Sequence, residues 1–332
     1  MVEVQTQVNL AEHTTLHIGG PAAEFVSVDT EGDLISALNC SIPILILGAG
    51  SNLLIADTGF AGRVIHIQTS GINLIDNQLN VAAGENWDEF VLWAVDNGFG
   101  FFAPLTGIPG TVGATPIQNV GAYGTEVSEL IESVTVFDRL TKEKLILNNN
   151  QCRFGYRNSL FKQEPERFVV LQVQFKPVKV EQIEVKYEEL AKKIGVNVSD
   201  LVDARRVLAA VREIRASKGM LLDVTDSDTY SVGSFFLNPR VSDDIKTELP
   251  SEVPAWQQQD GSWKISAAWL IANSGFVPGY RVGDASISSK HMLALCNRGK
   301  ATAKEIMQLA QEVRSAVKSR FDIELEFEPT IL

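Results

Sequence analysis

The chain has 332 residues, of which 45% are hydrophobic and 21% are charged, and its formal net charge is −12. This length is enough for two or three domains with their own cores, and the composition excludes a disordered protein. The acidic balance argues against a nucleic-acid backbone as partner, because such a partner requires a basic face.

The cysteines and histidines show no spacing typical of a disulfide framework or a metal site. The 3 cysteines form no CxxC pair, and an odd, sparse set is typical of a reducing compartment. The 4 histidines form no HExxH motif, so we expect no metal. No signal peptide is evident, and no apolar run approaches the roughly 18 residues that span a bilayer. We therefore expect a cytoplasmic protein with no membrane partner.

The first third of the chain alternates short strands and helices. Buried strands are expected over 24–28, 42–48 and 63–68. A hairpin over 72–84 is expected to turn near Asn77. Amphipathic helices are expected over 30–39 and 85–98. Thr30 and Asp33 hold capping-box positions in the first helix, and Gly98 ends the second.

The middle of the chain is less regular, because residues 101–126 are rich in glycine and proline. The elements expected after it are a hairpin over 134–148, strands over 168–175 and 323–329, and helices over 203–218, 264–275 and 302–321. Thr302 and Glu305 hold capping-box positions at the start of the last helix. A domain boundary is expected near Gly219.

Two glycine-rich loops carry the first functional signal. GAGSNLL, over 48–54, follows a buried strand, but Leu53 stands where a dinucleotide fingerprint would have its third glycine. A Rossmann site is therefore disfavoured, and no P-loop motif is present. Both glycine-rich loops could be simple tight turns, because glycine permits positive φ.

The second loop, over 108–126, is harder to explain by turns alone. Its small residues are Gly110, Gly113, Ala114, Gly121 and Ala122. They stand beside Thr115, Gln118 and Asn119, and so few bulky side chains favour close approach of another molecule to the backbone. Backbone amides can hold a pyrophosphate without basic side chains. The two loops together suggest a dinucleotide cofactor between two α+β lobes, even in an acidic protein.

Five segments, in chain order, resemble one enzyme family. They are LILGAGSNLLI (45–55), AAGENWDEFVLWAVDNG (82–98), IPGTVGATPIQNVGAYGTE (108–126), CRFGYRNSLFK (152–162) and VGSFFLNP (232–239). The family is that of the UDP-N-acetylenolpyruvoylglucosamine reductases, or UDP-N-acetylmuramate dehydrogenases. The similarity runs from about residue 15 to the C-terminus, and KYEEL around Tyr187 resembles the longer subtype with an extra tyrosine loop.

The resemblance implies an α+β fold in three parts. Two lobes, 1–69 and 70–218, would hold FAD in the manner of the vanillyl-alcohol-oxidase group, and residues 219–321 would bind substrate. Residues 322–332 are expected to return to the second lobe. The implied FAD-binding residues are Gly48, Gly50, Ser51, Asn52, Leu53, Gly110, Gly113, Ala114, Thr115, Gln118, Asn119, Gly121, Ala122 and Tyr123.

The implied activity is NADPH-dependent reduction of an enolpyruvyl ether of UDP-N-acetylglucosamine, in peptidoglycan precursor synthesis, by a monomer. Arg157 in GYRNS matches the family arginine that stabilises an enolate-like intermediate, and Ser234 in GSFFLNP matches the proton donor. Glu328 in LEFEP matches a second catalytic carboxylate. Glu326 stays a rival, because strand alternation puts both glutamates on one face and Phe327 replaces the proline that usually precedes the family glutamate.

Further positions match the family's contacts to the substrate. Tyr187, Lys218 and Asn238 would hold the UDP moiety, although Lys218 also ends a helix, where a cation suits the dipole. Tyr156 would orient the neighbouring arginine or simply pack. Trp256 lies where relatives carry a mobile aromatic residue, so stacking on uracil is conceivable.

Two other functions stay open on sequence grounds. An oxidase of the same fold group would tether its flavin to histidine or cysteine, and His66, in an apolar strand, resembles a core residue instead. A binding protein that has lost the flavin is disfavoured, because all three catalytic positions are intact. The sequence does not separate NADPH from NADH, and it leaves His291 as either a pocket residue or a structural one.

Overall fold

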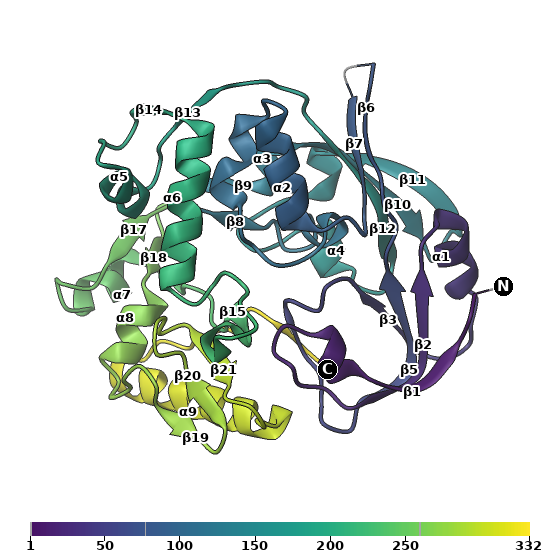
Figure 1. The fold of residues 1–332 in the computed structure, drawn as a ribbon. Helices are drawn as coiled ribbons and strands as arrows, with labels where there is room; N and C mark the ends of the chain where they lie inside the picture. Colours follow the sequence, from purple (N-terminus) through teal and green to yellow (C-terminus); the bar gives the residue numbers. More distant parts are fainter. Residues whose placement is uncertain (1, 77, 259) are drawn as a thin grey trace. The chain divides into compact units, whose positions relative to one another are not determined.

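The computed structural model describes residues 2–76, 78–258 and 260–332 (Figure 1). The chain forms two compact units, and each is α+β, as expected. Unit 1 consists of Met1–Val8, Ala22–Ala49 and Ala61–Ser217. Unit 2 consists of Asn9–Pro21, Gly50–Phe60 and Lys218–Leu332.

The first sheet of unit 1 has the strand order β1-β2-β5-β3. Its strands are β1 (Gln5–Asn9), β2 (Pro21–Val28), β5 (Phe60–Ile67) and β3 (Ile44–Leu47). The helix α1 (Glu31–Ala37) follows β2, and the Thr30 side chain accepts a hydrogen bond from the Asp33 backbone N–H, which confirms the predicted cap. The predicted strands over 24–28, 42–48 and 63–68 are likewise confirmed.

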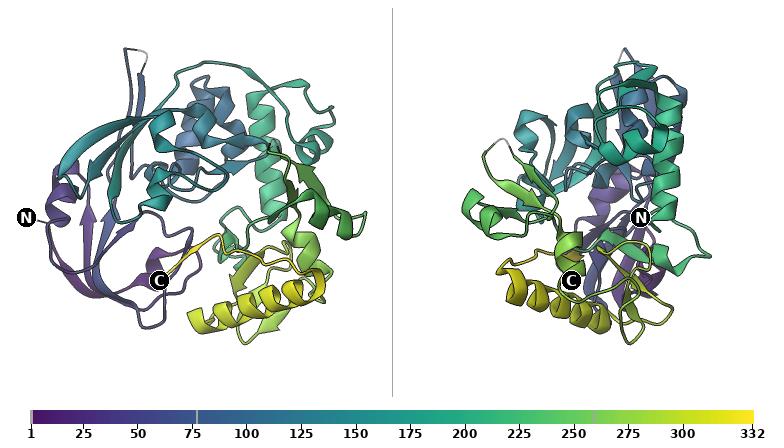
Figure 2. Two further views of the ribbon diagram at one scale, coloured as in Figure 1. Left: turned by 180° about the vertical axis from the view of Figure 1, so that it is seen from behind. Right: turned by 90° about the vertical axis from the view of Figure 1, so that its left-hand side faces the viewer.

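The second sheet of unit 1 is antiparallel, in the order β11-β10-β12-β7-β6 (Figure 1). Figure 2 shows the same ribbon from behind and from one side. Its strands are β6 (Ile72–Ile75), β7 (Gln78–Ala82), β10 (Ile131–Asp138), β11 (Glu143–Asn148) and β12 (Phe168–Phe175). Both predicted hairpins are confirmed. Asn77, where the first was expected to turn, lies outside the described residues.

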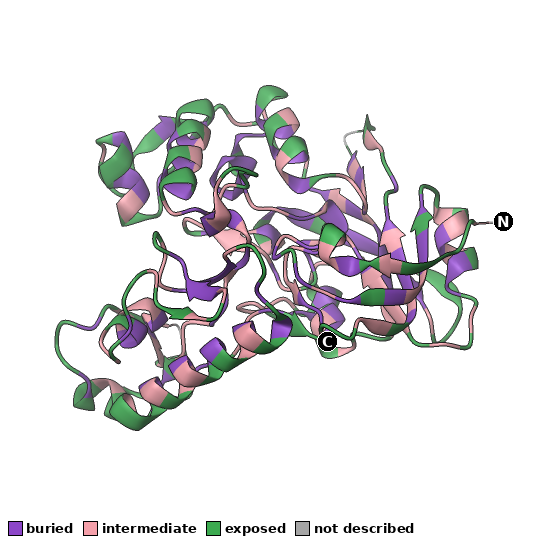
Figure 3. Cartoon of the chain, turned by 60° about the horizontal axis from the view of Figure 1, so that its bottom comes forward, coloured by how far each residue is buried: buried purple, intermediate pink, exposed green. Residues whose placement is uncertain are grey.

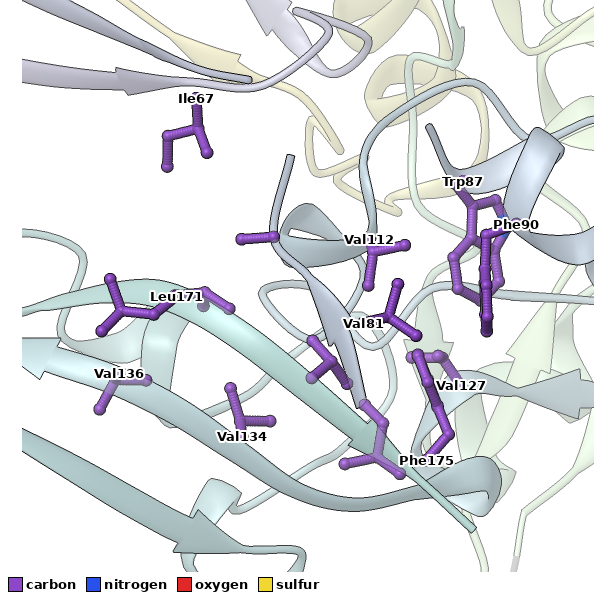
Figure 4. Close-up of a cluster of buried hydrophobic side chains, with 14 of the residues drawn as sticks. Ile67, Val81, Trp87, Phe90, Val112, Val127, Val134, Val136, Leu171 and Phe175 are labelled. Carbon is purple, nitrogen blue, oxygen red and sulfur yellow. The ribbon is translucent and has the colours of Figure 1, made fainter. Parts of the chain in front are cut away.

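One hydrophobic core joins these two sheets (Figure 4). Ile67 of the first sheet and Val81 of the second belong to it, together with Trp87 and Phe90 of α2 (Trp87–Asp96). The rings of Phe90 and Phe175 stack with centroids 5.2 Å apart. The lobes expected over 1–69 and 70–218 therefore share one core, because neither sheet buries its apolar face alone.

The remaining elements of unit 1 are short, apart from α6. They are η2 (Gly100–Leu105), η3 (Val112–Ala114), β8 (Gly121–Ala122), β9 (Thr125–Glu126), α3 (Val127–Leu130), η4 (Asn150–Cys152), α4 (Leu160–Gln163), β13 (Gln182–Glu184), α5 (Glu188–Ile194), β14 (Leu201–Asp203) and α6 (Ala204–Ser217). The predicted irregularity of 101–126 is thus confirmed. A second core, which includes Leu190, Val207 and Val211, packs α5 against α6.

Unit 2 contains two small antiparallel sheets, ordered β15-β21-β20-β19 and β16-β18-β17. The strands are β15 (Ser231–Ser234), β16 (Arg240–Val241), β17 (Ala255–Gln257), β18 (Trp263–Ile265), β19 (Arg281–Val282), β20 (Ala285–Ile287) and β21 (Ala294–Asn297). The helices are η1 (Leu10–His13), η5 (Ser227–Thr229), α7 (Asp243–Glu248), α8 (Ala267–Ala272) and α9 (Ala303–Phe321).

The helix α9 packs on β19, β20 and β21 through one apolar face. Ile306, Leu309, Val313 and Val317 of this face are buried, at the spacing expected of an amphipathic helix. Figure 3 shows buried and exposed residues alternating along such helices. Thr302 and Glu305 form the predicted capping box.

Within the described residues, no helix is long and apolar enough to cross a membrane.

Two predicted elements differ from the structure. The start of the helix expected over 264–275 is instead the strand β18, which pairs with both β16 and β17, and α8 begins only after Ser266 caps it. Residues 323–326 form no regular strand, and the segment pairs through a bridge between Phe327 and Phe236. Beyond it, β22 (Thr330–Ile331) pairs in parallel with β4 (Leu53–Leu54).

The domain boundaries also differ from the expected ones. Residues 9–21 and 50–60 belong to unit 2, because Leu16, Ile18 and Leu54 are buried in its core. Residues 322–332 were expected to return to 70–218, but they belong to unit 2, where β22 pairs with β4. Unit 1 ends at Ser217, beside the boundary expected near Gly219.

A buried ion pair in unit 2 predicts a pH-dependent contribution to stability. Asp228 is 4% exposed and pairs with Arg298. Burial raises the pKa of Asp228, but hydrogen bonds from Ser289, Arg298 and Ser288 outweigh burial and lower the pKa to about 2. Because the folded-state pKa is depressed, this stabilisation is present above the ordinary aspartate pKa and is lost as pH falls through about 2.

We therefore expect Asp228→Asn to lower the free energy of unfolding by about 3 kcal/mol at pH 7, since it leaves the Arg298 cation buried without its counter-ion. Urea unfolding at pH 7 and at pH 3 measures the free energy of unfolding of wild type and of the variant. The difference between the two proteins should be smaller at pH 3. The exposed Asp260→Asn is the matched control and should change little at either pH. An Asp228→Asn effect that is equal at both pH values would contradict the ion-pair explanation.

Candidate active site

The glycine-rich loop over 108–123 is fastened to the residues between β7 and α2. Val112 N–H donates to Glu85 O at 2.8 Å, and Gly113 N–H donates to Ala83 O at 2.8 Å. Trp87 N–H donates in turn to Gly110 O at 3.1 Å. The backbone of the loop is therefore fixed in one conformation by these hydrogen bonds.

Gly113 is required by packing within the protein. A methyl group on it would lie 2.5 Å from Ala83 Cβ and 2.9 Å from Ala83 Cα. We expect Gly113→Ala to lower the free energy of unfolding by about 1–3 kcal/mol through overpacking. Gly155→Ala is the control, since its methyl group would meet Asn158 Cβ at 3.9 Å, an ordinary contact. Urea unfolding compares the two variants, and equal stabilities would contradict this packing.

The two glycine-rich loops approach each other in unit 1 at Gly48 and Thr111. A methyl group on Gly48 would lie 2.6 Å from Thr111 Oγ1. Neither 48–54 nor 108–123 contains an aspartate or glutamate, although the whole chain carries a net charge of −12. Backbone N–H groups, hydroxyls and amides are the donor set that suits a pyrophosphate. The donor groups of each loop, taken by itself, therefore suit a phosphate group.

The side chains of these loops are not all directed to a ligand. Thr115 is buried and donates its hydroxyl to Val112 O at 2.8 Å. Gln118 and Ala114 are half-buried, and Asn119 is 1% exposed. Of the polar FAD-binding residues expected from the sequence, Thr115 thus bonds within the loop, and the Asn119 side chain bonds Glu126, Ser128 and Gly155.

The loop ends in a tight hairpin whose turn contains Tyr123. β8 and β9 pair, and the turn between them places Tyr123 at φ 50° and Gly124 at φ 83°, the left-handed geometry that favours glycine. Burial raises the pKa of Tyr123 to about 12, although its hydrogen bond with Arg215 acts in the opposite direction. The Tyr187 ring meets the Tyr123 ring edge-on, with centroids 5.7 Å apart. Tyr187 itself is 41% exposed.

Two arginines of α6 that the sequence did not predict, Arg212 and Arg215, are held by groups of unit 1. Arg215 of α6 is 7% exposed and donates from Nε to Gly107 O at 3.0 Å. Arg212, one turn earlier, pairs with Asp88 at 2.6 Å. The signal that could have found Arg215 is its place on the apolar stripe of α6, four residues after Val211, where a charged residue is unusual.

Arg157 lies at the tip of a two-residue turn. Gly155 and Asn158 exchange both backbone hydrogen bonds across this turn, at 3.0 and 3.1 Å. Arg157 has φ 50°, a conformation that costs energy for a residue with a side chain and that clusters at functional sites. Its Nη2 donates to Gly121 O at 2.7 Å and its Nη1 to Asn119 O at 3.4 Å. The guanidinium carbon lies 5.6 Å from the centre of the Tyr156 ring.

Unit 2 brings Ser234 and Glu328 onto neighbouring backbone segments. Ser234 ends β15, opposite Ala294 of β21. Glu328 N–H donates to Phe235 O at 3.0 Å, next to the bridge between Phe327 and Phe236. Glu328 is half-buried, whereas Glu326 is exposed. The two glutamates that sequence alternation placed on one face therefore differ in environment.

The first glycine-rich loop also contributes to this part of unit 2. Asn52 Nδ2 donates to Glu328 O at 3.4 Å, and Asn52 O accepts from Thr330 N–H at 3.0 Å. Leu53 pairs with Thr330 in β4 and β22. A methyl group on Gly50, at φ 59°, would lie 2.1 Å from His13 O, so this glycine allows a close approach between two chain segments.

The other residues expected at the substrate lie in unit 2. Asn238 Oδ1 accepts from Ala267 N–H at 2.9 Å, which fixes the amide orientation. Trp256 is 45% exposed and faces Lys264, whose Nζ lies 5.7 Å from the ring centre. His291 Nδ1 accepts from Leu293 N–H at 3.2 Å. Lys218 is the first residue of the C-terminal segment of this unit.

The described residues contain no group of three or more histidine, cysteine, aspartate or glutamate side chains that could hold a metal ion. Burial raises the pKa of Cys152 and of Cys296 to about 12, so neither thiol is a ready nucleophile.

Comparison with known proteins assigns the two parts of the chain. Residues 22–142 match a family described as FAD binding domain, and residues 225–332 match the C-terminal domain of UDP-N-acetylenolpyruvoylglucosamine reductase. A reductase of this name from Thermobifida fusca is 44% identical, over 98% of this chain and 97% of its own length. The chain belongs to the UDP-N-acetylenolpyruvoylglucosamine reductase family.

Further relatives agree with this membership. A reductase of the same name from Streptomyces coelicolor is 44% identical over 96% of this chain and 88% of its own length. The crystal structure of the reductase from Thermus caldophilus matches with a TM-score of 0.70 and 27% identity, over 100% of this chain and 99% of that one. The chain is thus an FAD-dependent oxidoreductase of peptidoglycan synthesis, and the family membership supports FAD and NADPH as its cofactors.

Proposed function

We propose that this chain reduces UDP-N-acetylglucosamine enolpyruvate to UDP-N-acetylmuramate, with NADPH as the reductant. The observation that best supports this proposal is the backbone hydrogen bond from Glu328 N–H to Phe235 O, which holds the main chain of Glu328 against the residue that follows Ser234. The sparse cysteines favour a reducing compartment, and we therefore place the reaction in the cytoplasm.

The chemistry requires a hydride and a proton to add across the vinyl ether. FAD, when bound, supplies the hydride that it has received from NADPH. As the hydride adds to the terminal vinyl carbon, the electron pair of the double bond moves toward the carboxylate. Negative charge then develops on the carboxylate and on the carbon that bears the ether. Protonation of that carbon completes the reduction, so one NADPH and one proton are consumed.

We assign three residues of this chain to these steps. Arg157 stabilises the developing charge, because a guanidinium can hold both carboxylate oxygens in parallel bonds. Ser234 gives its hydroxyl proton to the carbon that bears the ether. Glu328 assists the reaction at the same carbon. We assign this role to Glu328 and not to Glu326, because Glu328 is partly buried whereas Glu326 is exposed.

The remaining assignments concern binding. The loops over 48–54 and 108–123 would hold FAD mainly through their backbone groups and through Ser51 and Gln118. Tyr187, Lys218 and Asn238 would bind the UDP moiety, where Asn238 presents its N–H₂ end because its oxygen accepts from Ala267. Trp256, which is exposed on β17, would stack on uracil.

Product analysis under anaerobic conditions tests this function. Beyond the one equivalent that reduces the flavin, the purified protein should oxidise NADPH only when UDP-N-acetylglucosamine enolpyruvate is present, and should yield a product two hydrogen atoms heavier than the substrate. If NADPH is oxidised only when oxygen is admitted, the chain is an oxidase of the same fold, and the proposal is wrong. A protein purified without flavin that binds the UDP-sugar unchanged would indicate a binding protein instead.

A further inference from the structure

Asn119 is a buried residue whose side chain is fully occupied within unit 1. One amide hydrogen is donated to Glu126 Oε2 at 2.7 Å and the other to Gly155 O at 3.1 Å. Its Oδ1 accepts from Ser128 N–H at 3.1 Å. Because an asparagine amide has two hydrogens, both are used by the protein itself. The side chain is thus engaged by protein groups.

The same residue contacts the Arg157 turn at two points. Gly155, which accepts from the Asn119 side chain, is the first residue of that turn. The Asn119 main-chain carbonyl also accepts from Arg157 Nη1 at 3.4 Å. Asn119 has φ 46°, so both it and Arg157 adopt the left-handed conformation. Two such residues persist only where surrounding contacts hold them, and here they hold each other.

Glu126 completes this arrangement from the next strand. It pairs with Gly121 in the hairpin of β8 and β9, and Gly121 O accepts from Arg157 Nη2 at 2.7 Å. The point beside Gly121 where a methyl group would stand lies 2.9 Å from Glu126 Cγ and 3.2 Å from Arg157 Nη1. The side chains of Glu126 and Arg157 therefore crowd the same glycine.

We propose that Asn119 and Glu126 are positioning residues that fix the Arg157 turn against the glycine-rich loop. This inference rests on the proposed role of Arg157 in stabilising the carboxylate. Asn119 fastens the turn to the loop, and Glu126 holds the Asn119 amide in the orientation that does so. The guanidinium then reaches the substrate without first having to order its own backbone.

The inference can be tested by swapping the amide of Asn119 and the carboxylate of Glu126, first at Asn119 alone and then at both residues together. Asn119→Asp places a carboxylate against Glu126 and removes the donor to Gly155. In anaerobic stopped-flow experiments it should slow reoxidation of the reduced flavin by UDP-N-acetylglucosamine enolpyruvate roughly 100-fold, the scale expected for a misplaced catalytic group. Reduction of the flavin by NADPH should stay within about threefold of wild type, because Arg157 acts only on the carboxylate. Adding Glu126→Gln restores a donor to position 119 and should recover about tenfold of the lost rate.

Two further variants make the test decisive. Asn119→Gly also removes both donors but tolerates positive φ, so it replaces Asn119→Asp if that variant does not fold. Asn149→Ala is the matched control, because Asn149 also donates two amide hydrogen bonds, to Ser128 O and Ile131 O, neither of which belongs to the Arg157 turn. It should leave both half-reactions near wild type.

The outcomes separate this inference from the proposed function. If wild type is not reoxidised by the enolpyruvyl sugar, the proposed function fails. If wild type is reoxidised but Asn119→Asp slows both half-reactions equally, or merely lowers the flavin content, Asn119 serves the fold or the flavin and the inference is wrong. The inference is also wrong if Glu126→Gln gives no recovery in the double variant.

Discussion

Replacing Ser234 with alanine is expected to slow reoxidation of the reduced flavin by UDP-N-acetylglucosamine enolpyruvate by roughly 10³-fold, within the range for loss of a general acid. Flavin reduction by NADPH should stay within about threefold of wild type, since no proton is needed from Ser234 in that step. Separate stopped-flow measurements of the two half-reactions check this split. It follows from the assignment of Ser234 as the donor to the carbon that bears the ether.

Ser231→Ala is the matched control for this experiment. Ser231 lies in the same strand, and its hydroxyl accepts from Gly233 N–H at 3.2 Å, so its role is to shape the turn that precedes Ser234. The control should lose a little stability and keep both half-reactions. If both variants slow reoxidation of the flavin equally, the effect comes from any substitution in β15. Proton donation by Ser234 would then have no support.

Arg157→Lys has the second largest expected effect. A lysine keeps the positive charge but loses the planar fork, so it cannot hold both carboxylate oxygens in parallel. It also cannot donate to Gly121 O and Asn119 O through two nitrogens, as Arg157 does. We expect reoxidation by the enolpyruvyl sugar to slow roughly 100-fold, comparable to the loss of one oxyanion donor. Reduction by NADPH should change little.

Arg153→Lys provides the comparison. Arg153 is an arginine of the same segment and also has a positive φ, 49°, but it is exposed. If the slower reoxidation came only from the left-handed backbone at the substituted residue, it would appear in both variants. If the two variants behave alike in the stopped-flow assay, Arg157 has no special part in stabilising the substrate carboxylate.

The local signals in the sequence predicted most of the secondary structure. Thr30 and Thr302 cap helices where their spacing to an acidic residue indicated, because capping depends on neighbours within one turn. The strand expected over 168–175 is found at the same bounds. By contrast, Lys264 and Ile265 of β18 were assigned to a helix, since a three-residue strand shows no clear period and its partner strands lie elsewhere in the chain.

Long-range organisation could not be predicted in the same way. Residues 9–21 and 50–60 join unit 2 because Leu16 and Leu54 lie in one core whose other members, apart from Ile18, begin only at Val232. No local pattern encodes such a contact. The pairing of β22 with β4 has the same character, which is why the return of the C-terminus was assigned to the wrong segment.

In the candidate site, too, some features could be predicted from the local sequence and others only from the structure. The glycine-rich loops were found from composition, yet Gly113 and Gly50 prove to be required by protein packing, so scarcity of side chains indicates close approach without saying of what. Arg157 was placed through family resemblance, and its turn became visible only in the structure. Glu326 and Glu328 could not be separated by alternation, whereas burial separates them.

The most direct test of the proposed function is anaerobic stopped-flow absorbance of the flavin in the wild-type protein. Mixing with NADPH should bleach the flavin band, and subsequent mixing with UDP-N-acetylglucosamine enolpyruvate should restore it. This sequence would establish that hydride passes from NADPH through the flavin to the vinyl ether. A flavin that bleaches but recovers only with oxygen would contradict the proposed reaction and, with it, the roles assigned to Arg157, Ser234 and Glu328.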